Sequence, residues 1–428
     1  CYVMLTKSKH KSISFELEGT NSAGDLGAAA SVSFQHRNLF RGSETFMVKF
    51  RGAYEAISGL QPGYKNHNYT EYGVETSINF PNFLFPFLTS DFKRRIKATT
   101  EFGLQYNYQL RPEFSRTIAS ASWSYKWMQK QKIQHRIDLL DISYLYLPWI
   151  SSQFQEDYIN KDKDNYILKY NYENRLIVRM GYNYSYNSAG GALVNNTITT
   201  NSYSIRAGFE SAGNILYGIS KMINMRKNKD GEYAILGIPY AQYLKGDFDF
   251  AKNIIIDHRN SLAFHAGIGI AVPYGNAKVV PFEKRYFSGG ANSVRGWSVR
   301  NLGPGSFAGD GNFMNQSGDI KLDASIEYRT RLFWKFRGAA FIDAGNIWTI
   351  REYENQPGGV FEFDKFYKQI AVAYGLGLRL DLDFFVLRFD GGMKAINPKY
   401  KKAKERYPII HPKFSRDFAF HFAVGYPF

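Results

Sequence analysis

Apolar and polar side chains alternate with a period of two residues along almost the whole chain. The pattern is plainest at residues 418–428. There the even positions carry Phe418, Phe420, Phe422, Val424, Tyr426 and Phe428, and the odd positions carry small or polar residues. The same alternation occurs at residues 13–18 and 175–184. Successive side chains of a β-strand point to opposite sides, so a period of two indicates strands with one apolar face. The chain is therefore expected to be all-β.

The apolar faces are aromatic and the alternating runs are long, which favours a membrane barrel over a soluble β-sandwich. Tyr, Phe and Trp make up 17% of the 428 residues, although the mean hydropathy is only −0.37. Aromatic residues gather near the ends of runs, as at residues 123–127. Sandwich strands are shorter and richer in Val, Ile and Leu, whereas aromatic girdles are typical of outer-membrane barrels. No stretch approaches the roughly 18 apolar residues that a spanning helix needs.

The alternating runs divide into about sixteen strands, an even number as in bacterial outer-membrane barrels. The expected strands lie near residues 12–19, 26–36, 44–56, 69–80, 95–109, 113–128, 131–146, 164–186, 198–210, 233–250, 259–271, 318–330, 335–348, 369–381, 383–393 and 416–428. We therefore expect residues 12–428 to form a 16-stranded antiparallel transmembrane β-barrel and residues 1–11 to be the end of an upstream domain. If the first strand starts in the periplasm, long connections lie outside and short ones inside.

The first and last expected strands predict a weak seam. The first run ends at Gly19, whereas a spanning strand needs about 9 to 11 residues. In the last run Gly425 offers no side chain for packing and Pro427 has no N–H to donate. A seam that opens could pair its free edge with a strand of another protein. The residues assigned to this lateral gate are Ile13, Phe15, Leu17, Gly19, Phe420, Phe422, Gly425, Pro427 and Phe428, with Phe428 expected to point outward.

The connection at residues 272–317 carries the most informative motif. Loops longer than about 15 residues are usually functional or disordered. This one contains the glycines Gly289, Gly290 and Gly296, the apolar residues Phe287, Val294 and Trp297, and Arg295 at its apex. If the loop folds into the lumen, Arg295 needs a carboxylate partner, because a desolvated unpaired guanidinium is costly. The alternation in the next two strands places two candidates inward, Glu327 and Asp343.

These residues resemble a known family. Residues 287–297 are similar to the sixth-loop Val-Arg-Gly-aromatic signature of the BamA/TamA outer-membrane insertase and translocase superfamily. Residues 324–328 and 341–348 resemble the family's strands 12 and 13, and Phe428 is similar to its terminal aromatic residue. Residues 38–42 resemble its turn after strand 2, although Arg41 and Ser43 stand where glycines are commoner. Residues 16–25 and the turn at 40–42 look most like the TamA-like (TamL) branch of the Bacteroidota.

The resemblance implies a function in the bacterial outer membrane. Arg295 would be a latch that pairs with Glu327 and Asp343, and POTRA domains would precede the barrel. The protein would insert or export outer-membrane or surface proteins, including lipoproteins, without being an enzyme and without a cofactor. Its partners would be unfolded clients, outer-membrane lipids and lipopolysaccharide, and periplasmic or envelope-spanning accessory subunits. A passive porin or receptor-type barrel is the alternative. On that view Arg295 is a solvated loop residue, and Glu327 and Asp343 are hydrated lumen carboxylates.

Other signals exclude some functions and leave others open. The net charge of +16 does not indicate nucleic-acid binding, because the basic residues are scattered and no aromatic platform accompanies them. The densest basic cluster, at residues 399–406, would meet lipopolysaccharide phosphates or be a hydrated loop. Residues 81–94 combine phenylalanines with basic residues, which suits either an anchor in the inner leaflet or a packed turn. Catalytic motifs and histidine pairs for a metal are absent from the sequence.

The one cysteine, Cys1, excludes a disulfide framework and a cysteine-based zinc site within the chain. Cys1 would be either a truncation point or the lipidated first residue of a lipoprotein. Residues 1–11 lack the basic and apolar regions of a signal peptide.

Overall fold

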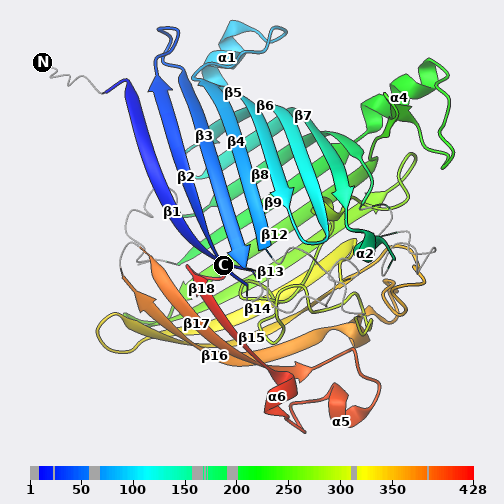
Figure 1. The fold of residues 1–428 in the computed structure, drawn as a ribbon. Helices are drawn as coiled ribbons and strands as arrows, with labels where there is room; N and C mark the ends of the chain where they lie inside the picture. Colours follow the sequence, from blue (N-terminus) through cyan, green and yellow to red (C-terminus); the bar gives the residue numbers. More distant parts are fainter. Residues whose placement is uncertain are drawn as a thin grey trace, which may run out of the picture.

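Sixteen antiparallel strands form one sheet that curls around a lumen in the computed structural model (Figure 1). The structure describes residues 9–22, 25–56, 68–156, 167, 170, 172–189, 201–309, 316–382 and 385–428. From β1 to β18, each strand of this sheet pairs with the next strand of the sheet along the chain. The prediction of a 16-stranded antiparallel barrel is confirmed. Residues 1–8 lie outside the described residues, so an upstream domain ending near residue 11 stays a prediction.

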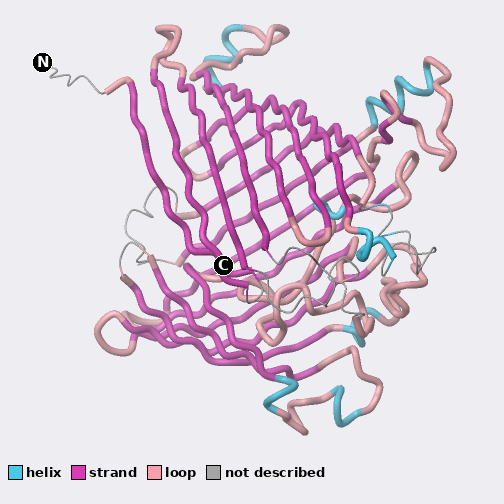
Figure 2. The backbone as a smooth tube through the Cα atoms, in the orientation of Figure 1, coloured by secondary structure: helices cyan, strands magenta, loops and turns pink. Residues whose placement is uncertain are grey.

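The barrel strands are β1 (Lys11–Ser22), β2 (Asp25–Arg37), β3 (Thr45–Ala56), β4 (Asn68–Phe80), β5 (Thr99–Leu110), β6 (Phe114–Gln129), β7 (Ile133–Ile150), β8 (Arg175–Asn187), β9 (Ser202–Ala212), β12 (Tyr243–Ile255), β13 (Asn260–Pro273), β14 (Ile320–Arg331), β15 (Phe336–Trp348), β16 (Ala371–Asp381), β17 (Val386–Ile396) and β18 (Phe418–Val424). Short elements lie in the connections, as Figure 2 shows. These are α1 (Ser90–Ile96), α2 (Ser152–Phe154), α4 (Asn214–Met222), α5 (Ala403–Arg406), α6 (Phe414–Asp417), the hairpin β10–β11 (Ala234–Ile235 and Ile238–Pro239) and two 3₁₀ turns (Phe282–Lys284 and Phe366–Gln369). None of the helices in the described ranges is long and apolar enough to span a membrane.

The alternation in sequence becomes two chemically different faces of the sheet. In β5 the outward side chains include Leu104 and Tyr106, which are exposed. The lumen side carries polar partners, such as the Lys126 Nζ that donates to Glu101 Oε2 at 2.6 Å. Neighbouring strands satisfy each other's backbone N–H and C=O groups, so the barrel wall can lie in lipid. Its apolar face then contacts the lipid, and its charged side chains stay in the lumen.

Several strand predictions were wrong in their bounds. β1 does not stop at Gly19 but pairs with β2 as far as Ser22 opposite Asp25. Residues 20–22 are all polar, so the alternation disappears from the sequence while the hydrogen-bonded ladder continues. β8 begins at Arg175 rather than near residue 164, and the run at 233–250 is the β10–β11 hairpin followed by β12. β1 is therefore long enough to cross the membrane, and the short strand is β18.

The backbone of the turn between β2 and β3 shows why glycines would be common at residues 38–43. Asn38, Arg41 and Ser43 all have positive φ values, of 64°, 66° and 67°. Glycine adopts this region at no steric cost, which is why a glycine-rich sequence would suit the turn. Here the Glu44 carboxylate accepts hydrogen bonds from the N–H groups of Phe40 and Gly42, both at 3.1 Å. These bonds help to hold the strained turn.

Candidate functional site

The long connection between β13 and β14, residues 274–319, is called loop 6 below, and its apex is buried. Val294, Arg295 and Trp297 have almost no exposed surface. Gly289 and Gly290 have φ values of 93° and 96°, so side chains would strain this bend. The Gly290 N–H donates to the Trp297 carbonyl at 2.8 Å, which closes the apex into a tight turn. Val294 and Trp297 pack with Leu302 and with Ala371 and Ala373 of β16.

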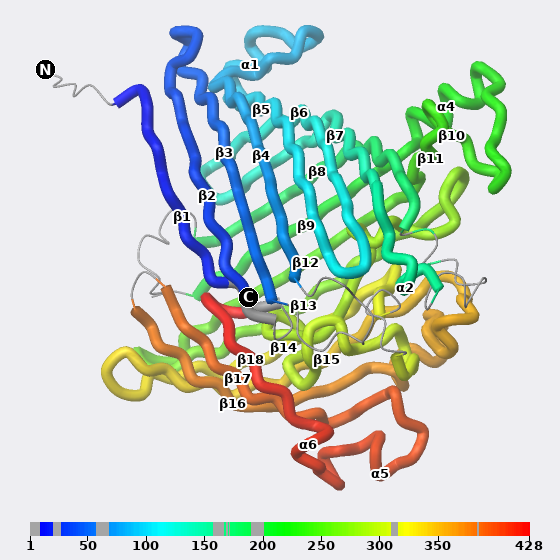
Figure 3. The backbone as a smooth tube through the Cα atoms, in the orientation of Figure 1, coloured from blue at the N-terminus to red at the C-terminus, as the bar shows by residue number. Residues whose placement is uncertain are grey.

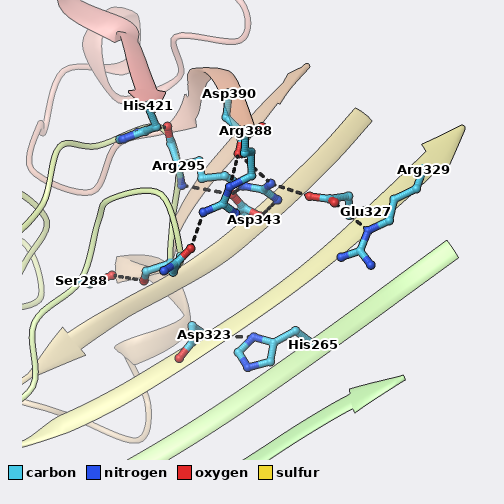
Figure 4. A network of polar contacts seen from close by, with 12 residues as sticks. His265, Ser288, Arg295, Asp323, Glu327, Arg329, Asp343, Arg388, Asp390 and His421 are labelled. Atoms are coloured by element: carbon cyan, nitrogen blue, oxygen red, sulfur yellow. Dashed lines mark hydrogen bonds and ion pairs between the residues drawn. The ribbon is translucent and has the colours of Figure 1, made fainter. Parts of the chain in front are cut away.

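Arg295 lies between the two carboxylates that the sequence singled out (Figure 4). Its Nε and Nη2 donate to the two Asp343 oxygens, each at 2.8 Å, and its backbone N–H donates to Asp343 at 3.0 Å. Its Nη1 donates to Glu327 Oε2 at 2.5 Å. The guanidinium carbon also lies 3.5 Å from the centre of the Phe341 ring. The two-pronged bond to Asp343 fixes both the position and the orientation of the loop apex.

Sequence reasoning missed residues of β16 and β17 that complete this network. Asp390 of β17 lies 3.5 Å from Arg295 Nη1 and accepts a bond from Arg379 Nη1 at 2.6 Å. Arg379 of β16 also donates to Glu327 at 3.0 Å. A third arginine, Arg388, donates to Asn292 of loop 6. Alternation along β16 and β17 would have identified Arg379, Arg388 and Asp390 as inward residues, but nothing in the sequence showed how deep the loop reaches.

Glycines make the room into which the loop apex fits. A Cβ atom at Gly392 of β17 would lie 2.1 Å from the Arg295 carbonyl oxygen. A Cβ atom at Gly296, within the loop, would lie 2.8 Å from the Ala373 Cβ of β16. His421 of β18 faces the same carbonyl, with its Nε2 2.9 Å from Arg295 O. Loop 6 therefore contacts the last strand of the barrel directly.

The two ends of loop 6 are joined beneath the apex. Tyr286 and Gly318 form an antiparallel bridge, and the Tyr286 hydroxyl donates to Asp247 Oδ1 of β12 at 2.6 Å. The buried Arg285 lies next to Asp319, at 3.2 Å from Nε to Oδ1. Burial, together with the Asp319 charge, raises the pKa of nearby Tyr353 to about 12.

The sheet ends at β1 and β18, and the described residues form no hydrogen-bonded ladder between these strands. In Figure 3 the first half of β1 stands clear of β18. Of the assigned gate residues, Ile13, Phe15 and Leu17 form one exposed apolar row on β1. Phe420 and Phe422 form another on β18, whose ladder with β17 runs only from Phe418 to Val424.

The last residues do not lie where the sequence placed them. Gly425 has a φ of 84°, and the chain leaves the ladder after Val424. The Phe428 ring then stacks on His265 of β13, at 5.2 Å and 19°. Arg329 of β14 lies over Tyr426 and Phe428 at 4.5 and 5.3 Å. The prediction that Phe428 points outward is wrong, because the turn at Gly425 breaks the alternation and directs residues 426–428 into the lumen.

Comparison with known proteins then identifies the family. The Omp85 superfamily domain matches residues 22–428. The chain belongs to the Omp85 superfamily. A stretch of 97 residues is 32% identical to the outer membrane protein assembly factor BamA of Neisseria meningitidis serogroup B. That stretch is 21% of this chain and 12% of the relative, so the chain spans a small part of the relative's length.

One solved structure supports the fold of this Omp85 chain, and a second is more distantly similar. BamA from Haemophilus ducreyi, lacking POTRA domains 1–3, has a TM-score of 0.61 at 17% identity, over 98% of this chain and 70% of that chain. CdiB from Acinetobacter baumannii has a TM-score of 0.46 at 10% identity, over 97% of this chain and 59% of that chain. The Omp85 family match, together with the fold shared with the Haemophilus ducreyi BamA structure, makes the protein an outer-membrane β-barrel. Within the described residues, no group of three or more His, Cys, Asp or Glu side chains could hold a metal ion.

Proposed function

We propose that this Omp85 protein inserts or exports outer-membrane or surface proteins, lipoproteins among them, through a lateral gate between β1 and β18. The observation that carries the proposal is the missing ladder at this one junction of the sheet. β1 has 12 residues, and about half of an edge strand's N–H and C=O groups face away from its partner. Each unsatisfied group costs several kcal/mol in hydrocarbon. Such an edge can pair with an incoming strand by β-augmentation, and the new hydrogen bonds supply the driving energy.

The loop 6 network supports a role in controlling the gate. Arg295 is held by β14 and β15 through Glu327 and Asp343, while its carbonyl faces His421 of β18. The loop thus connects the fixed wall of the barrel with the strand that would have to move. We assign Arg295 as the latch of loop 6, with Glu327 and Asp343 as its partners. Asp390 and Arg379 extend this assignment to β17 and β16.

The name of the meningococcal relative, an assembly factor, favours a similar activity over a passive porin or receptor-type barrel. Among the branches of the superfamily, the residues 16–25 and the turn at 40–42 favour the TamL branch of the Bacteroidota. A POTRA-like domain upstream of residue 12, with accessory subunits bound to it, completes the proposal.

A locked barrel tests the gate. Cys1→Ser gives a cysteine-free background, since Cys1 is the only cysteine. Cysteine pairs are then scanned between residues 13–17 of β1 and 420–424 of β18. Oxidation of one pair is expected to abolish client assembly, and reduction is expected to restore it. The matched control is Phe46→Cys with Ile78→Cys, which are register partners within the continuous β3–β4 ladder.

Full client assembly by a completely oxidised gate pair would exclude the lateral gate and favour passage through the lumen. Single-channel conductance distinguishes the proposed function from the porin alternative. A porin gives a stable open channel in wild-type protein, whereas the proposed function predicts a large conductance only after loop 6 is released.

A further inference from the structure

The connection between β4 and β5, residues 81–98, is unusually long for its end of the barrel. It contains α1 and stands near the top of Figure 1. Most other turns at this end are tight, such as residues 130–132 between β6 and β7 and residues 256–259 between β12 and β13, and the next longest connection is residues 188–201 between β8 and β9. Short turns mark the periplasmic end of outer-membrane barrels. The length of residues 81–98 therefore indicates a role besides joining β4 and β5.

This connection folds back onto the outer wall of the barrel. Thr100 of β5 pairs with Tyr125 of β6, on the same outward row as Leu104, which is 63% exposed. Thr100 and Tyr125 are nevertheless only 0% and 2% exposed, because residues 82–85 cover them. Thr100 Oγ1 accepts from the Leu84 N–H at 2.9 Å and donates to the Asn82 carbonyl at 2.7 Å. The Tyr125 hydroxyl donates to the Leu84 carbonyl at 3.1 Å.

Apolar side chains cover the outside of this folded connection. Phe83 packs edge-on against Tyr125, with ring centres 4.7 Å apart, and Phe85 contacts Phe87 at 5.6 Å. Phe87 itself is 86% exposed, and Leu84 and Phe92 are also exposed. An apolar cluster of this kind would be unfavourable in water. Ring contacts from Phe83 through Tyr125 to Trp123 join it to the outward face of β6. This continuity with the lipid-facing belt indicates that lipid covers it.

Positive charges follow directly on this apolar cluster. Lys93, Arg94, Arg95 and Lys97 lie in or just after α1, against one acidic residue, Asp91. In the described part of the chain no carboxylate forms an ion pair with these four residues. Basic residues beside an apolar surface are the pattern of an interfacial anchor, in which the cations meet lipid phosphates.

We infer that residues 81–97 bind anionic phospholipids of the periplasmic leaflet. Leu84, Phe87 and Phe92 enter the acyl region, while Lys93, Arg94 and Arg95 hold the phosphates. The hydrogen bonds to Thr100 and Tyr125 fix this anchor to the β5–β6 wall. The inference goes beyond the lateral gate and rests on the barrel's position in the outer membrane, so it stands or falls independently of the gate.

Spin-label accessibility tests the apolar part. Phe87→Cys in the Cys1→Ser protein is labelled and placed in vesicles of phosphatidylethanolamine and phosphatidylglycerol. Leu104→Cys on the lipid-facing wall and His258→Cys in the tight β12–β13 turn are the lipid and water controls. The label at position 87 is expected to be relaxed by oxygen more than by a water-soluble nickel complex, as at position 104. Nickel access equal to that at position 258 would overturn the inference. Shielding from both reagents would also overturn it, because protein would then cover the site.

Charge removal tests the phosphate contacts. Lys93→Gln, Arg94→Gln and Arg95→Gln are combined, and the preference for spin-labelled phosphatidylglycerol over phosphatidylcholine is measured. The preference is expected to fall by up to about fivefold for each cation removed. The control, Arg226→Gln with Lys227→Gln and Lys229→Gln, removes the same charge from the exposed β9–β12 connection at the opposite end and is expected to leave the preference unchanged. A change smaller than about twofold in the α1 variant, or an equal change in the control, would reject phospholipid binding by these cations.

Discussion

Substitution of Arg295 by alanine should release loop 6 without unfolding the barrel. Asp343 is fully buried, and Arg295 is the one cation among the described residues with which it forms an ion pair. Glu327 would keep Arg329 and Arg379, and Asp390 would keep Arg379. The free-energy cost of the substitution therefore comes mainly from Asp343, which loses its ion-pair partner. Removing one partner of a buried ion pair typically costs about 3 to 5 kcal/mol. Since about 1.4 kcal/mol is tenfold, the open population of the loop should rise by roughly two to three and a half orders of magnitude.

The rate of thiol labelling at a buried loop position measures this change. Ser288→Cys in the Cys1→Ser protein places a nearly isosteric reporter in loop 6, where Ser288 is buried. When opening and closing are fast compared with labelling, the rate follows the open population. Arg295→Ala should accelerate labelling by the factor above, and client assembly should fall. Arg300→Ala, which removes an arginine of the same loop that lies over the Phe287 ring, is the matched control and should change the rate far less.

Two results would contradict the role of Arg295 as the latch of loop 6. Unchanged labelling of a folded Arg295→Ala barrel would mean that the ion pairs do not hold the loop. Equal acceleration in the Arg300 control would mean that any loss of positive charge loosens it. In a double-mutant cycle, Arg295→Ala with Asp343→Ala should cost less than the sum of the single substitutions, because the second removes the carboxylate left unpaired by the first.

Two further predictions concern the wall opposite loop 6 and the end of the chain. Gly392→Ala should also speed labelling at position 288 and lower activity, because its Cβ would lie 2.1 Å from the Arg295 carbonyl oxygen. The control, Gly391→Ala, should have little effect, because the nearest contact of its Cβ is the Phe418 ring at 3.1 Å. Equal effects of the two substitutions would contradict the proposed fit of loop 6 against β17. Phe428→Ala removes the stack on His265 and should increase the protease sensitivity of residues 425–428 without loosening loop 6. Normal protease resistance in that variant would show that the stack does not hold the chain end in the lumen.

The sequence predicted the features that follow from strict alternation. Glu327 and Asp343 lie on regular ladders, where every second residue faces the lumen, so their inward position could be read directly. The same rule failed for Phe428, because one left-handed residue, Gly425, ends the alternation. It also failed for the length of β1, because backbone hydrogen bonds continue through residues 20–22 without an apolar pattern. The roles of Arg379 and Asp390 depend on the depth of loop 6, which is a tertiary property.

Cross-linking of a client to the free edge of β1 is the most direct test of the lateral gate. A stalled outer-membrane client with single cysteines along its last strand is combined with Phe15→Cys on β1, in the Cys1→Ser background. Gln105→Cys, on the lumen side of β5, is the control. A lateral gate predicts disulfides between Phe15→Cys and client positions on one face of the client strand, which are every second residue, and few disulfides at Gln105→Cys. Cross-links at Gln105→Cys without any at Phe15→Cys would contradict the lateral gate.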